Sequence, residues 1–138
     1  MNDTEFHIVE AIPEAAAYAA LRAGVGWNAL PVEAVKQGLQ GALYSVCVYR
    51  AEQLVGFGRI LGDGGIYFYL QDVIVLPEFQ GRGLGQQIME KLMGYLQANA
   101  QSGAFVGLMA ARGAEGFYLK YGFERRGEDR PGMYRVWA

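Results

Sequence analysis

An apolar strand, a glycine-rich turn and an amphipathic helix follow one another between residues 73 and 96. Residues 73–85 read VIVLPEFQGRGLG, and beyond Gly83 the apolar residues repeat at helical spacing (Leu84, Ile88, Leu92, Leu96). A helix N-terminus offers N–H groups without intrahelical partners and a partial positive charge, and glycines let an anion approach the backbone closely. The order therefore predicts an anion-binding turn, with Arg82 as a cation at its rim.

The spacing of the glycines in this turn excludes two common phosphate-binding motifs. A Walker loop needs G-x-x-x-x-G-K-[ST], and a dinucleotide-binding turn needs G-x-G-x-x-G. Gly81, Gly83 and Gly85 give G-x-G-x-G instead. What the sequence does contain is Q-x-x-G-x-G, starting at Gln80, directly after V-I-V-x-P.

The rest of the chain predicts an α/β protein with the element order β-αα-βββ-α-β-α-β(β). Apolar alternation and short apolar runs predict strands at residues 6–10, 45–50, 54–61, 66–76, 105–110, 123–126 and 133–137. Helical spacing, Pro and Gly predict helices at residues 13–23, 31–40, 83–96 and 114–121. We expect one domain over residues 1–138, built on a mixed central sheet of six or seven strands with helices on both faces.

Composition excludes several classes of function. The formal net charge is −2 and no run of Lys or Arg exceeds a pair, so no nucleic-acid partner is expected. One Cys and one His leave too few soft ligands for a metal site, and none is predicted. No apolar stretch reaches membrane-spanning length and the start does not resemble a signal peptide, so we expect a cytoplasmic protein without a membrane partner.

Two motifs together give the chain a family resemblance. The first is the Q-x-x-G-x-G turn after the strand, and the second is the stretch AEGFYLKYGF at residues 114–123. In both, and in element order over nearly its whole length, the chain resembles the GNAT superfamily of acyl-CoA-dependent N-acetyltransferases. Residues 71–75, QDVIV, and 131–134, PGMY, are similar to the aralkylamine-type and other small-amine members.

The resemblance implies acetyl-CoA as the acyl donor, a small-molecule primary amine as the acceptor, and direct transfer without a covalent enzyme intermediate. It implies that pantetheine pairs with the backbone of Val73 to Val75, where the Val75 N–H faces the thioester oxygen. The pyrophosphate would rest on amides from Gln80 to Gly85, and Tyr118 would protonate the departing thiolate. The cofactor-binding residues implied are Val73, Ile74, Val75, Gln80, Gly81, Arg82, Gly83, Leu84, Gly85 and Tyr118. A homodimer is compatible with the resemblance.

The group that removes a proton from the acceptor amine is not evident in the sequence. Asp72 is the catalytic candidate besides Tyr118, and in a buried strand its carboxylate should be either paired or raised in pKa. Tyr69 and Gln71 share strand parity with Val73 and Val75, but neither is a good base at neutral pH. Ala111 stands where family members often carry Asn or Asp.

Three other residues carry weaker expectations. Cys47 lacks a His partner and is expected to be a buried thiol rather than a nucleophile. His7 is expected at the surface or a sheet edge. Trp27 either lines the acceptor pocket or covers the core.

Two further functions compete with small-amine acetylation. A peptide N-terminus or a lysine could be the acceptor, which would require an open groove. The chain could instead be a non-catalytic acyl-CoA sensor or interaction module, and Ala111 favours this alternative if it marks a lost proton relay.

Overall fold

The computed structural model describes residues 5–137 and divides the chain into two compact units. The first unit ends at Gly107 and the second begins at Leu108. Among the described residues, the first unit contains most of the sheet, three α-helices and the short 3₁₀ helix η2 (Pro77–Phe79), and the second contains one short α-helix and the C-terminal segment.

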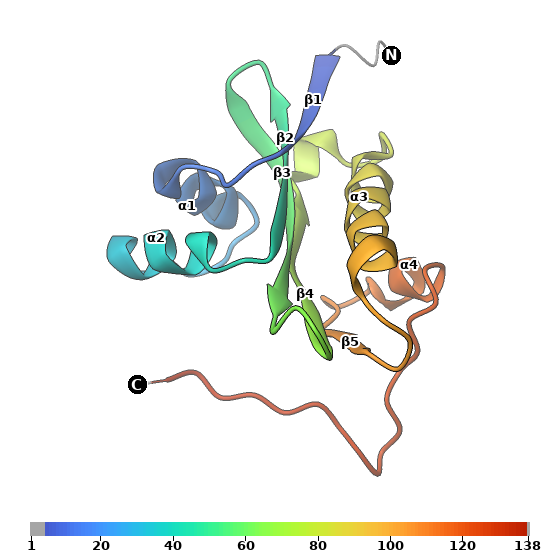
Figure 1. Ribbon diagram of the computed structural model, residues 1–138. Helices are drawn as coiled ribbons and strands as arrows, with labels where there is room; N and C mark the ends of the chain where they lie inside the picture. The colour runs from blue at the N-terminus through green and yellow to red at the C-terminus, as the bar shows by residue number, and fades with distance from the viewer. Residues whose placement is uncertain (1–4, 138) are drawn as a thin grey trace. The chain divides into compact units, whose positions relative to one another are not determined.

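Five strands form one sheet in the order β1-β2-β3-β4-β5 (Figure 1). Their bounds are Phe6–Glu10 for β1, Tyr44–Arg50 for β2, Gln53–Gly62 for β3, Tyr67–Val75 for β4 and Phe105–Leu108 for β5. The pairs β1–β2, β2–β3 and β3–β4 are antiparallel. The beginnings of β4 and β5 lie together, because the Phe105 N–H donates to the Ile66 carbonyl over 2.9 Å. Because both strands start at the same end of the sheet, they run parallel, and a helix forms the crossover connection between them. The sheet is therefore mixed.

Helices cover both faces of this sheet (Figure 1). Helices α1 (Ala15–Gly24) and α2 (Val32–Gln40) lie on one face, where the Tyr18 and Phe57 rings meet edge to face at 5.7 Å. Helix α3 (Leu84–Asn99) lies on the other, and Ile88 and Leu92 approach Gly58 of β3 so closely that a Cβ there would clash. The core comprises the side chains between these layers, among them Leu21, Val46, Val48, Val55, Phe57, Ile60, Phe68, Ile88, Met89 and Leu92.

The expected sixth and seventh strands are absent from the described residues, which is a correction to the sequence prediction. Residues 123–126 and 133–137 have no regular secondary structure. The strand expected at residues 105–110 ends at Leu108 and lies at a sheet edge, partly exposed rather than buried. Residues with strand propensity form a strand only where another strand pairs with their backbone, and local sequence does not supply that partner.

The second unit is built around an aromatic cluster. Helix α4 (Glu115–Leu119) is shorter than the predicted residues 114–121. The Phe117 ring contacts those of Tyr118 and Tyr121 at centroid distances of 5.2 and 5.5 Å, and Tyr118 also contacts Phe123. Across the described part of the chain, no helix is long and apolar enough to cross a membrane.

Candidate active site

The predicted anion-binding turn has an open backbone. Gly81 and Gly83 have φ angles of 81° and 79°, in the left-handed region that favours glycine, and Gly83 is the N-cap of α3. A Cβ built on either glycine would meet no atom within 4 Å. The first turn of α3 holds no acidic residue, and no side chain caps it. The free N–H groups and the dipole of this helix therefore favour an anion in the space above the glycines.

The end of β4 leads directly to this turn. The Leu76 N–H donates to the Val55 carbonyl of β3 over 2.9 Å. Because backbone groups of successive residues in a strand point to opposite edges, the N–H and C=O of Val75 point away from β3. The Gln80 side chain reaches that edge and donates to the Val75 carbonyl over 2.9 Å. Gln80 therefore ties the glycine-rich turn to the end of the strand.

Strand β4 extends beyond its neighbour β5 on the same edge. The two strands start side by side, but β4 has nine residues and β5 has four. A Cβ on Gly107, near the end of β5, would lie 3.6 Å from the ring of Tyr69, which is only partway along β4. Residues 73–75 thus form a stretch of strand that β5 does not reach, and the Val75 N–H points toward this side.

A β-bulge interrupts β4 just before this stretch. Arg59 pairs with Gln71 and Phe57 with Ile74, so Asp72 and Val73 both oppose the single residue Gly58. Asp72 takes a φ of 58°, which Asp and Asn tolerate better than most residues.

The bulge overturns the expected parity of the strand. Gln71 pairs with Arg59 on the face that α1 and α2 cover, whereas Val73 lies on the α3 face beside the position of Gly58. Gln71 and Tyr69 therefore lie on the opposite face from Val73 and Val75. Their expected common face was wrong, because an extra residue in one strand reverses the alternation of all side chains beyond it.

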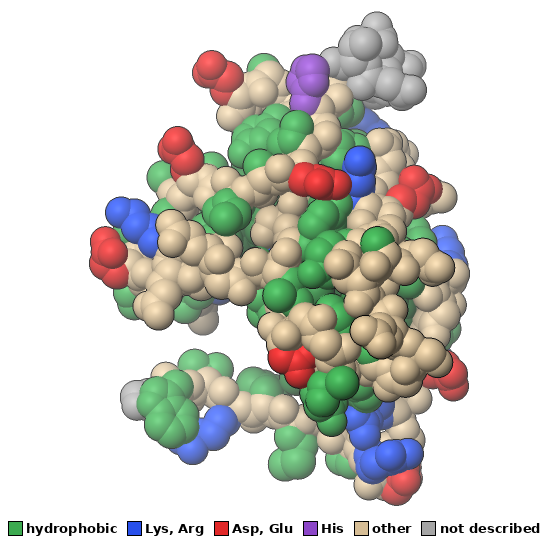
Figure 2. Space-filling model, viewed as in Figure 1, with side chains coloured by type: hydrophobic (Ala, Val, Ile, Leu, Met, Phe, Trp, Pro, Cys, Tyr) green, Lys and Arg blue, Asp and Glu red, His purple; other side chains and the backbone are tan. Residues whose placement is uncertain are grey.

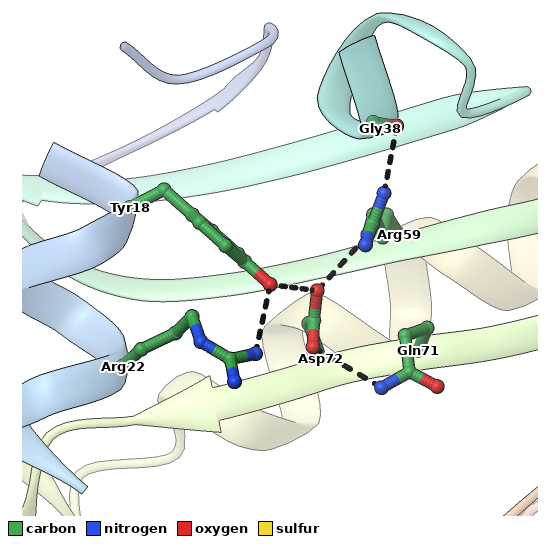
Figure 3. A network of polar contacts seen from close by, with 6 residues as sticks. All are labelled: Tyr18, Arg22, Gly38, Arg59, Gln71 and Asp72. Carbon is green, nitrogen blue, oxygen red and sulfur yellow. Dashed lines mark hydrogen bonds and ion pairs between the residues drawn. The ribbon is translucent and has the colours of Figure 1, made fainter. Parts of the chain in front are cut away.

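The Asp72 carboxylate is the centre of a buried polar network between the sheet and α1 (Figure 3). Its Oδ2 accepts hydrogen bonds from the Tyr18 hydroxyl at 2.7 Å and from the Arg59 Nε at 3.0 Å. Its Oδ1 accepts one from the Gln71 Nε2 at 3.2 Å. The Asp72 side chain is 1% exposed and that of Arg59 13%. The sequence left two possibilities for this carboxylate, a paired state or a raised pKa. The structure shows the paired state.

Two further hydrogen bonds connect the network to α1 and α2. The second guanidinium nitrogen of Arg59 donates to the Gly38 carbonyl near the end of α2, over 3.0 Å. Arg22 contacts the Tyr18 hydroxyl at 3.4 Å. Burial, and then the neighbouring Asp72 carboxylate, raise the pKa of Tyr18, so its hydroxyl keeps the proton that it donates.

Tyr18 and Arg59 are site residues that were not expected from the sequence. Arg59 lies within the otherwise apolar stretch GFGRIL, and Tyr18 within an Ala-rich helix. A charged residue inside a buried strand requires a partner of opposite charge. Arg59 and Asp72 are charged residues of opposite sign in two predicted buried strands. Their pairing could therefore have been predicted from the sequence.

Arg82 is held beside the glycine-rich turn. Its Nη1 lies 3.4 Å from a carboxylate oxygen of Glu5, which Arg50 also contacts at 3.0 Å. The guanidinium also lies over the rings of Phe6 and Phe79 at 5.7 and 5.8 Å. Arg82 therefore lies next to the turn with an acidic partner.

Tyr118 lies in the second unit, on α4, and its side chain is partly buried in the aromatic cluster there. Burial raises its pKa above the ordinary value of 10.0. The phenol therefore carries its proton throughout the neutral range.

The weaker expectations for Cys47 and His7 have clear outcomes. Cys47 is fully buried, its thiol contacts the Ala11 carbonyl at 3.2 Å, and burial raises its pKa to about 11, as expected of a thiol that is not a nucleophile. His7 is exposed on the edge strand β1, as predicted. Trp27 is 38% exposed, and the Arg22 guanidinium lies 5.4 Å from its ring centre.

A surface hollow of about 480 Å³ lies between α1 and α2. Ile12, Pro13, Val32, Lys36 and Leu39 are among its lining residues. None of the predicted site residues lines it, so the chemistry of the candidate site is not located there.

Comparison with known proteins places the chain in a family. A model of the acetyltransferase (GNAT) domain matches residues 15–132. The protein of unknown function SA2161 from meticillin-resistant Staphylococcus aureus has a similar structure, with a TM-score of 0.90 and 36% identity over 96% of this chain and 99% of that one. The chain belongs to the GNAT acetyltransferase family.

Two curated relatives are also similar in sequence. The uncharacterized N-acetyltransferase ycf52 of Porphyra purpurea is 32% identical over 115 residues, 80% of this chain and 64% of that protein. Serotonin N-acetyltransferase 2, chloroplastic, of Oryza sativa subsp. japonica is 39% identical over 69 residues, 50% of this chain and 34% of that protein. The chain thus spans less than two thirds of the length of these relatives.

Proposed function

We propose that the protein transfers acetyl from acetyl-CoA directly to a primary amine of a small molecule. The observation that carries the proposal is the pairing of an open glycine turn at the α3 N-terminus with a stretch of β4 that extends past β5. The glycine turn suits a pyrophosphate, and the exposed strand edge suits an extended chain that bears amides. Coenzyme A contains both groups. The name of the rice relative supports a small amine as the acceptor.

In this proposal most of the coenzyme affinity comes from main-chain groups. The amides from Gln80 to Gly85 hold the pyrophosphate, where the helix dipole of α3 adds a favourable field. Leu84 is buried and anchors the start of the helix, so its contribution is its N–H group. Val73, Ile74 and Val75 offer the strand edge, and Arg82 stands at the rim.

The Val75 N–H is proposed to stabilise the transition state. The acetyl thioester supplies an activated carbonyl, and negative charge develops on its oxygen as the amine attacks. A fixed donor aimed at that oxygen contributes about 3 kcal/mol to lowering the barrier. The contact of Gln80 with the Val75 carbonyl supports this role, because it restrains the peptide backbone at this residue.

We assign Asp72 to positioning rather than to proton removal. Its two oxygens already accept from three donors, one of them a guanidinium. Its left-handed backbone forms the bulge that directs the strand beyond it. The network thus fixes the orientation of the amides at Val73 and Val75. Tyr118 is proposed as the acid that protonates the departing thiolate, which leaves more readily when it receives a proton.

Substitution of Gly83 by Ala tests the coenzyme site. The new Cβ would occupy the space proposed for the pyrophosphate, so we expect affinity for coenzyme A to fall at least about tenfold, or about 1.4 kcal/mol. Gly26→Ala is the matched control, because Gly26 has a φ of 81° and equally open surroundings. Both variants should lose similar stability, about 1–2 kcal/mol for a left-handed Ala. Titration calorimetry with coenzyme A and acetyl-CoA measures the difference.

Two results would contradict the coenzyme assignment. One is a folded wild-type protein that gives no heat with either nucleotide. The other is equal coenzyme affinity in the two glycine variants.

The acceptor is then tested separately with labelled acetyl-CoA against panels of small amines and peptides. Preference for peptides would favour a peptide or lysine acceptor, and coenzyme binding without turnover would favour a sensor. A cytoplasmic location stays a prediction, and the rice relative is named as chloroplastic.

A further inference from the structure

Two arginines share one carboxylate beside the glycine-rich turn. Arg50, at the end of β2, and Arg82, within the turn, both contact Oε1 of Glu5, at 3.0 and 3.4 Å. Figure 2 shows basic and acidic side chains close together on the surface at the end of the sheet where β1 begins. The proposed function places Arg82 at the rim of the coenzyme site and gives Arg50 and Glu5 no role.

Aromatic rings hold the two guanidinium groups in place. The Phe79 ring is buried, and the guanidinium carbons of Arg50 and Arg82 lie 5.4 and 5.8 Å from its centre. Phe6 meets Phe79 edge to face at 5.9 Å, and its ring centre lies 5.7 Å from the Arg82 guanidinium. Each cation is attracted to the ring, but two cations at one ring repel each other. The arrangement therefore favours an anion that contacts both guanidinium groups.

The Glu5 carboxylate provides this anion through ion pairs that are partly open to solvent. A single oxygen, Oε1, contacts both arginines, and the side chains of Arg50 and Arg82 are 47% and 32% exposed. Ion pairs with this exposure contribute little to stability, so another anion can replace the carboxylate at a small cost. A phosphate monoester suits the position better, because it carries more charge and because guanidinium groups bind phosphate through two parallel hydrogen bonds.

We propose that Arg50 and Arg82 bind the phosphate monoester on the ribose of coenzyme A, and that Glu5 occupies this subsite until the phosphate displaces it. The inference rests on the proposed function and adds to it a subsite for the third phosphate of the coenzyme. Arg82 lies between Gly81 and Gly83, whose open backbone is the proposed pyrophosphate site. In coenzyme A only the ribose separates the pyrophosphate from the third phosphate, so the ligand requires two neighbouring anion subsites.

Dephospho-coenzyme A tests the subsite, because it lacks only the ribose phosphate. We expect the wild-type protein to bind coenzyme A at least about ten times more tightly, since the charge-assisted hydrogen bonds to that phosphate are lost in the shorter nucleotide. Arg50→Gln and Arg82→Gln should each reduce this ratio of affinities to about threefold or less. Glu5→Gln should raise the affinity for coenzyme A about threefold, because the carboxylate no longer competes. Titration calorimetry with both nucleotides gives these affinities.

Lys36→Gln is the matched control for the loss of one positive charge. Lys36 is an exposed cation on α2, which covers the other face of the sheet from α3, so this variant should keep the wild-type ratio. Arg50, Arg82 and Glu5 are all partly exposed, and circular dichroism should therefore show that every variant is folded.

The possible outcomes separate this inference from the proposed function. Equal affinity of the wild-type protein for the two nucleotides would overturn the ribose-phosphate subsite and leave the coenzyme assignment standing. An unchanged ratio in either arginine variant would place that phosphate elsewhere and overturn the subsite of two arginines. Unchanged or weaker coenzyme binding in Glu5→Gln would overturn the displacement of Glu5. If neither nucleotide binds to the folded wild-type protein, the coenzyme assignment and this inference both fail.

Discussion

Replacing Arg59 with Ala is expected to lower the free energy of unfolding by about 3 kcal/mol, which is a large part of the stability of a small domain. The Asp72 side chain is 1% exposed in the wild-type protein, and the substitution removes the cation that contacts it. The expected loss is at the lower end of the range for a broken buried pair, because Tyr18 and Gln71 still donate to Asp72. Urea unfolding followed by circular dichroism measures the change.

Two companion variants make this measurement specific. Lys36→Ala breaks the exposed ion pair with Glu33 and should cost less than about 1 kcal/mol. Arg59→Met with Asp72→Asn removes both charges and should lose less stability than Arg59→Ala, because no charge stays buried alone. Asn also tolerates the left-handed backbone at residue 72. Equal losses in Arg59→Ala and Lys36→Ala would show that the buried pair is not energetically important.

Tyr118→Phe is expected to reduce kcat by about 100-fold, the lower end of the range for losing a general acid. The KM for acetyl-CoA should change far less, because the ring and its aromatic contacts are retained. Tyr121→Phe is the matched control, since Tyr121 belongs to the same aromatic cluster. Steady-state kinetics on an acceptor found by the amine panel gives both constants. Unchanged turnover in Tyr118→Phe would remove the phenol from the mechanism.

The pH profile gives an independent readout of the same residue. Burial raises the pKa of Tyr118 above 10.0, so its proton is present at neutral pH and is lost only in strongly alkaline solution. Loss of the acid should therefore lower kcat only above about pH 10. That alkaline decrease should be absent in Tyr118→Phe.

Local sequence patterns predicted the core of the fold with small errors at element ends. The strand at residues 6–10 was confirmed, and the long helix was predicted from Gly83 where it begins at Leu84. These elements depend on short-range periodicity and on Pro and Gly at their ends, which are properties of neighbouring residues. The positive φ angles at Gly81 and Gly83 likewise suit the residue type that the sequence provides.

Long-range contacts decided the rest. The bulge at Asp72 reversed the expected facing of Gln71 relative to Val73, and no local pattern around residue 72 indicates an extra residue in the strand. Arg59 and Tyr18 became site residues because two strands and a helix bring them to one carboxylate from positions 13 and 54 residues away.

The sequence by itself determined the glycine turn, the helix that follows it and the apolar strand before it, and these carry the coenzyme-binding hypothesis. Only the tertiary structure decided which face of β4 each side chain takes, what neutralises Asp72, and that residues 133–137 lack a strand partner within the described chain. The physical reason is that turns and helices are stabilised mainly by groups close in sequence. A strand is completed only by hydrogen bonds and packing from distant segments.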